Sequence, residues 1–121
     1  MKYLLDTNAV IYLLKGVGNF EFMKEENELI LSFITIIELL AFAKEEDKEN
    51  IQGFLMFCEK IFADELLMKT VIKIRKNLKL KIPDAKISAT SIEKEAILVT
   101  ADKEMINKCR KIGIVVLNPL E

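Results

Sequence analysis

Four acidic side chains are the residues of this chain best placed to do chemistry, because of where they stand relative to its apolar segments: Asp6, Glu38, Asp84 and Asp102. Asp6 and Asp102 come shortly after apolar runs, and Glu38 lies early in the helical segment that follows another run. Asp84 opens the helical segment that leads into the fourth run. If these runs are parallel strands, the helices between them begin at the carboxyl edge of the sheet, so all four carboxylates should gather at that edge.

Carboxylates gathered in this way repel one another, so they stay ionised only if a cation neutralises them, and otherwise some of them bind protons. The chain contains no histidine, which excludes catalysis by Ser-His-Asp or Cys-His groups. A ligand set made only of oxygens favours Mg²⁺ or Mn²⁺. Such an ion suits phosphodiester hydrolysis, because it generates a hydroxide nucleophile and stabilises charge on the phosphate and the leaving oxygen.

Each acid also has a purely structural interpretation. Asp6 and Asp102 are ordinary helix caps in sequence terms, and Asp84 after Pro83 is an ordinary helix start. Glu38 and Thr35 stand three residues apart and could form a narrow solvated stripe on a helix. Taken one at a time these signals are weak, and it is their joint order around the apolar runs that favours a site.

The elements that must position these acids are short apolar strands alternating with helices. The predicted strands are 2–5, 29–32, 61–63, 96–100 and 114–117. The predicted helices are 9–15, 20–27, 33–46, 48–60, 64–81, 84–95 and 102–111. The strands are continuously apolar, which is typical of strands buried on both faces. We therefore expect an α/β fold, a three-layer α/β/α sandwich with a mostly parallel central sheet of about five strands.

The composition is that of a single folded domain covering residues 1–121. The chain is 51% apolar and 31% charged, with a net charge of −1, so it can build a core, and no global positive field marks it as a nucleic-acid binder. Cys58 and Cys109 are expected to be buried or half-buried thiols in a reducing compartment. No signal-peptide core or membrane span is visible, so a cytoplasmic protein is expected.

Two sets of surface candidates remain open at this stage. The basic run 73–81 and the pair Arg110-Lys111 could contact RNA phosphates, or could be the solvated faces of two helices. Several bulky apolar residues are hard to bury in so small a domain and would suit a dimer contact or a groove for a partner helix, although they could equally belong to the core: Leu13, Leu14, Phe20, Phe22, Met23, Met56 and Phe57.

Four segments together resemble the PIN-domain family, and within it the VapC-like toxins of type II toxin–antitoxin systems. They are LLDTNAVIYLL around Asp6, TIIELL around Glu38, PDAKISATSI around Asp84 and ILVTADKEM around Asp102. The first and third motifs are fairly specific in combination, and the second and fourth are loose. The resemblance extends over nearly the whole chain, from Lys2 to Pro119.

The resemblance implies a parallel sheet between helices, RNA cleavage that depends on Mg²⁺ or Mn²⁺, frequent homodimers and a protein antitoxin. Carried over residue by residue, it assigns the metal site and catalysis to Asp6, Glu38, Asp84 and Asp102, supported through hydrogen bonds by Thr7 and Thr100. Many relatives have Asn or Asp where this chain has Ala101. Because of that departure, Glu104 is a second candidate for the outermost acid.

Two other functions are compatible with the same residues. The first is a PIN-like module that has lost catalysis and only binds a protein partner, which the four intact acids argue against. The second is a phosphoryl-transfer protein with Asp6 as the phosphate acceptor. Such sites usually have a second acid close after the acceptor and a lysine at a later strand end, but Thr7 follows Asp6 and no lysine ends the run 96–100.

Overall fold

The computed structural model describes residues 1–121 and contains one five-stranded sheet in which every neighbouring pair of strands is parallel. The spatial order is β3-β2-β1-β4-β5, so β1 lies at the centre. The strands are β1 (Lys2–Leu5), β2 (Glu28–Ser32), β3 (Glu59–Ile61), β4 (Ile97–Val99) and β5 (Val116–Leu117). In the central strand Tyr3 pairs with Leu29 on one side and with Ile97 on the other.

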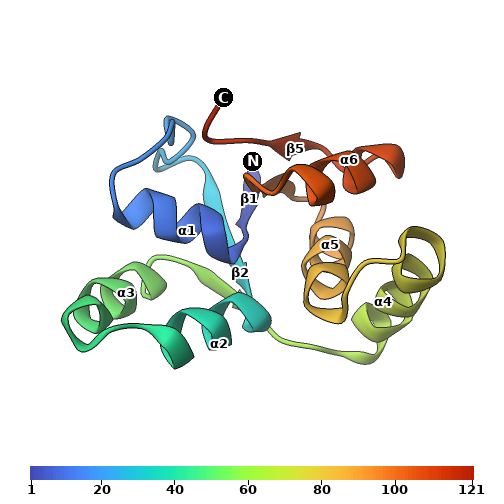
Figure 1. The fold of residues 1–121 in the computed structure, drawn as a ribbon, viewed down its shortest axis with the longest axis horizontal. Helices are drawn as coiled ribbons and strands as arrows, with labels where there is room; N and C mark the ends of the chain where they lie inside the picture. The colour runs from blue at the N-terminus through green and yellow to red at the C-terminus, as the bar shows by residue number, and fades with distance from the viewer.

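Helices cover both faces of the sheet, as Figure 1 shows. They are α1 (Thr7–Leu14), α2 (Phe33–Phe42), α3 (Lys48–Leu55), α4 (Glu65–Leu78), α5 (Ile82–Lys94) and α6 (Lys103–Lys111), with one short 3-10 turn, η1 (Glu45–Asp47). One face packs on α1, α2 and α3, and the other packs on α5 and α6. Helix α4 packs on α5 and does not contribute to the core on the sheet itself. None of the helices is long and apolar enough to cross a membrane.

The position of the central strand β1 explains why its sequence is continuously apolar and does not alternate with polar residues. Tyr3 and Leu5 belong to the core cluster under α1, α2 and α3, whereas Leu4 belongs to the cluster under α5 and α6. Successive side chains of a strand point to opposite faces, and here both faces are covered, so every position must be apolar. The prediction of an α/β sandwich with a parallel sheet is confirmed.

The predicted helix 20–27 is wrong, because that segment consists of turns without a helix. The Phe22 ring stacks on Tyr3 of the central strand with the ring centroids 4.5 Å apart, and it also contacts the Phe20 ring. The Asn27 side chain donates a hydrogen bond to the Phe22 carbonyl at 2.8 Å. These contacts with the sheet and within the loop replace the helical hydrogen bonds that the amphipathic pattern predicts.

Several predicted boundaries also move. The helix predicted over 33–46 ends at Phe42, and the one predicted over 48–60 ends at Leu55. The third strand covers Glu59–Ile61 instead of 61–63, because pairing with β2 sets its register, with Ser32 opposite Ile61. Residues with ordinary helix propensity follow both helix ends, so the local sequence does not mark where these helices stop.

The two cysteines are free thiols and both are buried, as predicted. Burial raises the pKa of Cys58 to about 11, so this thiol stays protonated near neutral pH.

Candidate active site

The sheet has a topological switch point beside its central strand. From β1 the chain moves outward through β2 and β3, and it then returns to the other side of β1 to form β4 and β5. The connections leave β1 and β4 in opposite directions, and ligands of open α/β sheets generally bind at the carboxyl ends of two such strands. Leu5 pairs with Val99 there, and the Asp6 backbone N–H donates to the Val99 carbonyl at 3.1 Å. Asp6 and Thr100 are therefore neighbours at this point.

Asp6 is the most deeply buried acid, with 4% of its surface exposed. It is the N-cap of α1, and its Oδ1 accepts a hydrogen bond from the Ala9 N–H at 3.0 Å, while its Oδ2 accepts one from the Thr100 hydroxyl. Burial raises the pKa of Asp6 to about 6. The bonds from Thr100 and Ala9 oppose this shift, and the negative charges of Asp102 and Asp84 add to it.

Asp84 and Asp102 lie at the starts of α5 and α6. Asp102 is the N-cap of α6, and its Oδ1 accepts from the Met105 N–H at 3.2 Å. Its own N–H donates to the Thr100 hydroxyl at 3.2 Å, so Thr100 links Asp102 to Asp6. Asp84 stands in the first turn of α5, where burial and then the charges of Asp102 and Glu38 raise its pKa, partly opposed by Lys81.

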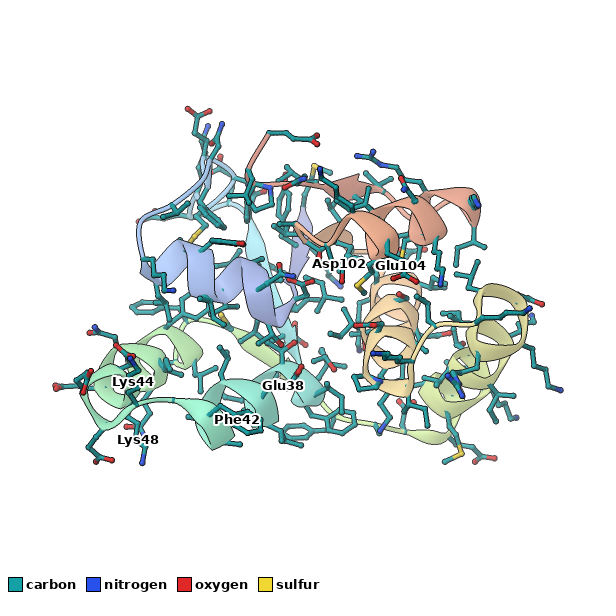
Figure 2. All side chains as sticks on the ribbon, in the orientation of Figure 1. Glu38, Phe42, Lys44, Lys48, Asp102 and Glu104 are labelled. Atoms are coloured by element: carbon teal, nitrogen blue, oxygen red, sulfur yellow. The ribbon has the colours of Figure 1, made fainter.

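Glu38 joins the same region from α2. Its Oε1 accepts a hydrogen bond from the Thr7 hydroxyl at 2.8 Å, which ties α2 to the first residue of α1. Because the charge of Glu38 acts on Asp84, and those of Asp84 and Asp102 act on Asp6, the four predicted acids share one region of the molecule. Figure 2 shows Glu38 and Asp102 reaching into that region from different elements.

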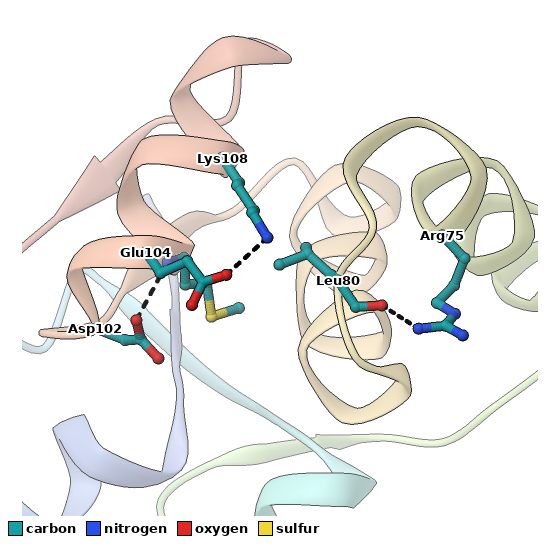
Figure 3. A network of polar contacts seen from close by, with 6 residues as sticks. Arg75, Leu80, Asp102, Glu104 and Lys108 are labelled. Atoms are coloured by element: carbon teal, nitrogen blue, oxygen red, sulfur yellow. Dashed lines mark hydrogen bonds and ion pairs between the residues drawn. The ribbon is translucent and has the colours of Figure 1, made fainter.

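Glu104 is placed differently from the other acids. Like Asp102 it is exposed, but its carboxylate forms an ion pair with Lys108 at 2.7 Å, which lowers the pKa of Glu104. Figure 3 shows this pair beside Asp102, with the Asp102 carboxylate turned toward the start of α6. The negative charge of Asp102 raises the pKa of both Asp6 and Asp84, whereas Glu104 acts on Asp84 alone and as the smallest of the causes there. The position of Asp102 therefore favours it over Glu104 as the outermost acid.

The donor set fits a hydrated divalent cation. No three acidic side chains stand close enough together in this structure to chelate one ion directly. Mg²⁺ is usually bound through one or two carboxylates and keeps several waters, so direct chelation by three or four groups is not required. Each oxygen of Asp6 accepts one bond from the protein and has a lone pair left for a cation or its water. The hydroxyl of Thr35, three residues before Glu38, is buried and has no hydrogen-bond partner in the protein.

Two residues at this edge have roles that differ from their sequence interpretation. Thr35 is fully buried, which rules out the alternative interpretation of Thr35 and Glu38 as a solvated stripe, because α2 turns Thr35 toward the protein. Asn8, which the motif analysis did not single out, accepts a hydrogen bond from the Ala101 N–H at 3.2 Å. Its position next to Asp6 and Thr7 is the only sequence signal for this role. Asn8 thus links the end of β1 to the end of β4 through the backbone of Ala101, whose side chain is not polar.

Comparison with known proteins agrees with this geometry. A family model described as the PIN domain matches residues 3–111. A chain of a toxin–antitoxin complex from Klebsiella pneumoniae is similar, with a TM-score of 0.78, 27% identity and 98% of each chain covered. A chain of VapBC-1 from nontypeable Haemophilus influenzae matches with a TM-score of 0.78 and 20% identity, over 100% of each chain. A chain of FitAcB from Neisseria gonorrhoeae matches with a TM-score of 0.76 and 24% identity, over 97% of each chain. No curated protein matches the sequence significantly. The chain therefore belongs to the PIN-domain family, and its fold is like that of chains in VapBC toxin–antitoxin structures.

Proposed function

We propose that this protein is a metal-dependent endoribonuclease and the toxin of a toxin–antitoxin pair. The observation that carries the proposal is the gathering of Asp6, Glu38, Asp84 and Asp102 at the switch point of a PIN-family sheet. We assign these four carboxylates to catalysis and to the binding of Mg²⁺ or Mn²⁺, with Thr7 and Thr100 as supporting residues. A divalent ion bound there supplies an activated water and stabilises the charge that develops on the phosphate.

The protein's own contribution is to orient carboxylates that would otherwise repel one another. Thr100 and the Ala9 N–H each hold one oxygen of Asp6, and Thr7 holds Glu38. Asp6 and Asp102 are N-caps, and Asp84 lies in the first turn of its helix. Helix N-termini carry partial positive charge, which stabilises these carboxylates before any cation or phosphate arrives.

The substrate and partner proposals rest on the surface. In the basic run 73–81, Lys73, Lys76, Lys79 and Lys81 are exposed, whereas Arg75 donates to the Leu80 carbonyl, as Figure 3 shows. Lysines of this kind can neutralise RNA phosphates without reading sequence.

An antitoxin and a second copy of the chain are proposed as protein partners. The similar structures named above include toxin–antitoxin complexes, and this chain exposes apolar side chains that a partner could cover. Met56 and Phe57 are 84% and 83% exposed, and Phe42 at the end of α2 is 86% exposed (Figure 2). Among the other candidates, Leu14 and Met23 are exposed, Leu13 and Phe20 are half-buried, and Phe22 is buried.

The first experiment is a cleavage assay on mixed single-stranded RNA with Mg²⁺, Mn²⁺ or EDTA. It compares the intact protein with Asp6→Asn and Asp84→Asn. Asparagine caps helices as well as aspartate does, so the Asp6 substitution removes charge while keeping the cap. Asp64→Asn is the matched control, because Asp64 caps α4 through the Leu67 N–H at 2.8 Å and does not act on the pKa of Asp6 or Asp84.

We expect cleavage that requires metal, that is lost in Asp6→Asn and Asp84→Asn, and that survives in Asp64→Asn. Protein that stays inert with both metals would favour the binding-module alternative. The phosphate-acceptor alternative is disfavoured by the burial of Asp6 and by the Thr100 hydroxyl on its Oδ2, since an acceptor oxygen must reach a phosphoryl group. Labelling of Asp6 by a phosphoryl donor would revive that alternative.

A further inference from the structure

One buried hydroxyl in this protein has no hydrogen-bond partner. Seven polar or charged residues are buried, and six of them bond through their side chains to the protein: Asp6, Ser32, Ser88, Thr90, Ser91 and Thr100. The seventh is Thr35, which is 0% exposed and whose Oγ1 is the single buried side-chain oxygen or nitrogen left unpaired. Such a group carries its full desolvation cost, so its presence requires a reason.

The position of Thr35 explains why its own helix cannot satisfy it. Buried hydroxyls in helices usually donate to the carbonyl four residues earlier, as Ser88 and Thr90 do in α5 at 2.9 and 2.8 Å. Thr35 is the third residue of α2, so the residue four positions earlier is Leu31 in β2. That strand is extended and pairs with β3, so its carbonyl is not in helical register with Thr35. A partner must come from outside the helix.

The same position places Thr35 at the candidate site. Helix α2 starts directly at the carboxyl end of β2, the strand that pairs with β1, and Ser32 caps it by accepting from the Ile34 N–H at 3.3 Å. Glu38 follows three residues after Thr35, on the same side of the helix. Glu38 is also the acid that Thr7 holds at 2.8 Å. Thr35 is thus one helical turn from Glu38, an acid of the site.

We propose that Thr35 is a positioning residue of the acidic site, and that its hydroxyl binds an ordered water which Glu38 shares with the hydration shell of the bound cation. This inference rests on the proposed function. Mg²⁺ and Mn²⁺ sites that keep their waters need protein groups to orient those waters, and groups in such outer positions commonly change metal affinity by 10–100-fold. Valine would fill the same space without the unpaired oxygen, so packing alone does not account for threonine.

The test compares Thr35→Val, which keeps the shape and removes the hydroxyl, with Thr35→Ser, which keeps the hydroxyl. Mn²⁺ affinity is measured on the RNA-free protein from the electron paramagnetic resonance signal of unbound Mn²⁺, and folding is checked by thermal unfolding in EDTA. Thr90→Val is the matched control, because it removes a buried hydroxyl that already bonds to its own helix. A crystal structure of the intact protein with Mn²⁺ provides a measurement that does not depend on any variant.

We expect Thr35→Val to unfold at a temperature equal to or above that of the intact protein and to bind Mn²⁺ about tenfold more weakly. Thr35→Ser and Thr90→Val should bind Mn²⁺ like the intact protein. In the crystal, a water should lie within hydrogen-bond distance of Thr35 Oγ1 and of Glu38.

Unchanged Mn²⁺ affinity in Thr35→Val would overturn the inference while leaving the nuclease proposal intact, provided that Asp6→Asn loses the metal. An empty position beside Thr35 Oγ1 in the crystal would overturn it as well, even if Thr35→Val failed to fold. If the intact protein bound Mn²⁺ no better than Asp6→Asn, the proposed metal site itself would fail, and the role of Thr35 would fail with it.

Discussion

Asp6 shows how one buried carboxylate couples folding to protonation. Burial raises its pKa from the ordinary 3.8 to about 6. Between these two pH values the folded chain binds a proton that the unfolded chain releases. The contribution of Asp6 to stability is therefore greatest below pH 3.8 and is lost as the pH rises through 6. Near neutral pH Asp6 is ionised and its burial destabilises the folded chain, and a cation bound beside it would remove part of that cost.

We expect Asp6→Asn to stabilise the protein in EDTA at pH 7.5, by at most about 3 kcal/mol, which is the size of the pKa shift in free energy. The gain should shrink as the pH falls below 6 and vanish near pH 4. Urea unfolding at pH 7.5, 5.5 and 4 measures this difference. Asp64→Asn should show no such pH dependence, and a gain of equal size at every pH would mean that the charge of Asp6 is not its cause.

The choice between Asp102 and Glu104 is also decided at the scale of single residues. Both side chains are exposed, but the backbone N–H of Asp102 bonds to Thr100, which also holds Asp6, whereas the Glu104 carboxylate is paired with Lys108. We expect Asp102→Asn to lower the RNA cleavage rate on the order of a hundredfold or more, and Glu104→Gln to lower it much less. Single-turnover cleavage at saturating Mg²⁺ compares the two variants. A larger loss in Glu104→Gln would move the fourth acid to that position.

At the scale of elements, the site is built from helix starts. Helices α1, α2, α5 and α6 all begin at the carboxyl edge of the sheet, because each leads away from that edge in a parallel fold. Asp6 and Asp102 each cap a helix, and in the proposed site they would supply charge as well. This double use is why each of them can be interpreted in the sequence as an ordinary cap.

Capping and catalysis can be separated by comparing two caps. Asp64→Ala and Asp102→Ala each remove an N-cap that accepts a hydrogen bond from a backbone N–H. Each should cost about 0.5–2 kcal/mol of stability. Only Asp102→Ala should also lose RNA cleavage when both variants are assayed well below their unfolding temperatures. Equal loss of activity in the two would show that the effect of Asp102 is structural.

At the scale of the whole molecule, the four acids come from segments far apart in the chain, between residues 6 and 102. They stand after β1, within α2, at the start of α5 and after β4. A cation bound among them would connect both helical layers and the two strands at the switch point. Because the unfolded chain has no such site, binding should stabilise the entire fold.

We expect Mg²⁺ at about one hundred times its dissociation constant to add about 2.7 kcal/mol to the free energy of unfolding at pH 7.5. The gain should be smaller at pH 5, because protons compete for Asp6, and it should disappear in Asp6→Asn. Thermal unfolding over a Mg²⁺ titration measures it. Ca²⁺ at the same concentration is the control for ionic strength and for nonspecific charge screening, and equal stabilisation of Asp6→Asn would argue against this site.

The local pattern of apolar and acidic residues in the sequence determined the fold class and the order of the candidate site residues. Continuous apolar runs such as that of Lys2–Leu5 occur where both faces of a strand are buried, so they identify a parallel sheet between helices. The positions of the acids after these runs then predict that they meet at one edge. The PIN-type order of Asp6, Glu38, Asp84 and Asp102 can therefore be recognised from the sequence alone.

Contacts between distant segments determined the rest. The amphipathic pattern of residues 20–27 is locally helical, but stacking of Phe22 on Tyr3 holds the segment as turns. The spacing of Thr35 and Glu38 defines a shared side of a helix, yet only the docking of α2 decides that Thr35 is buried. The bond from the Ala101 N–H to Asn8 spans 93 residues of sequence. The periodicity of apolar residues predicts local structure over a few turns of a helix. Side-chain burial and strand pairing depend on which surfaces contact one another, and those contacts form only when the helical layers pack on the sheet.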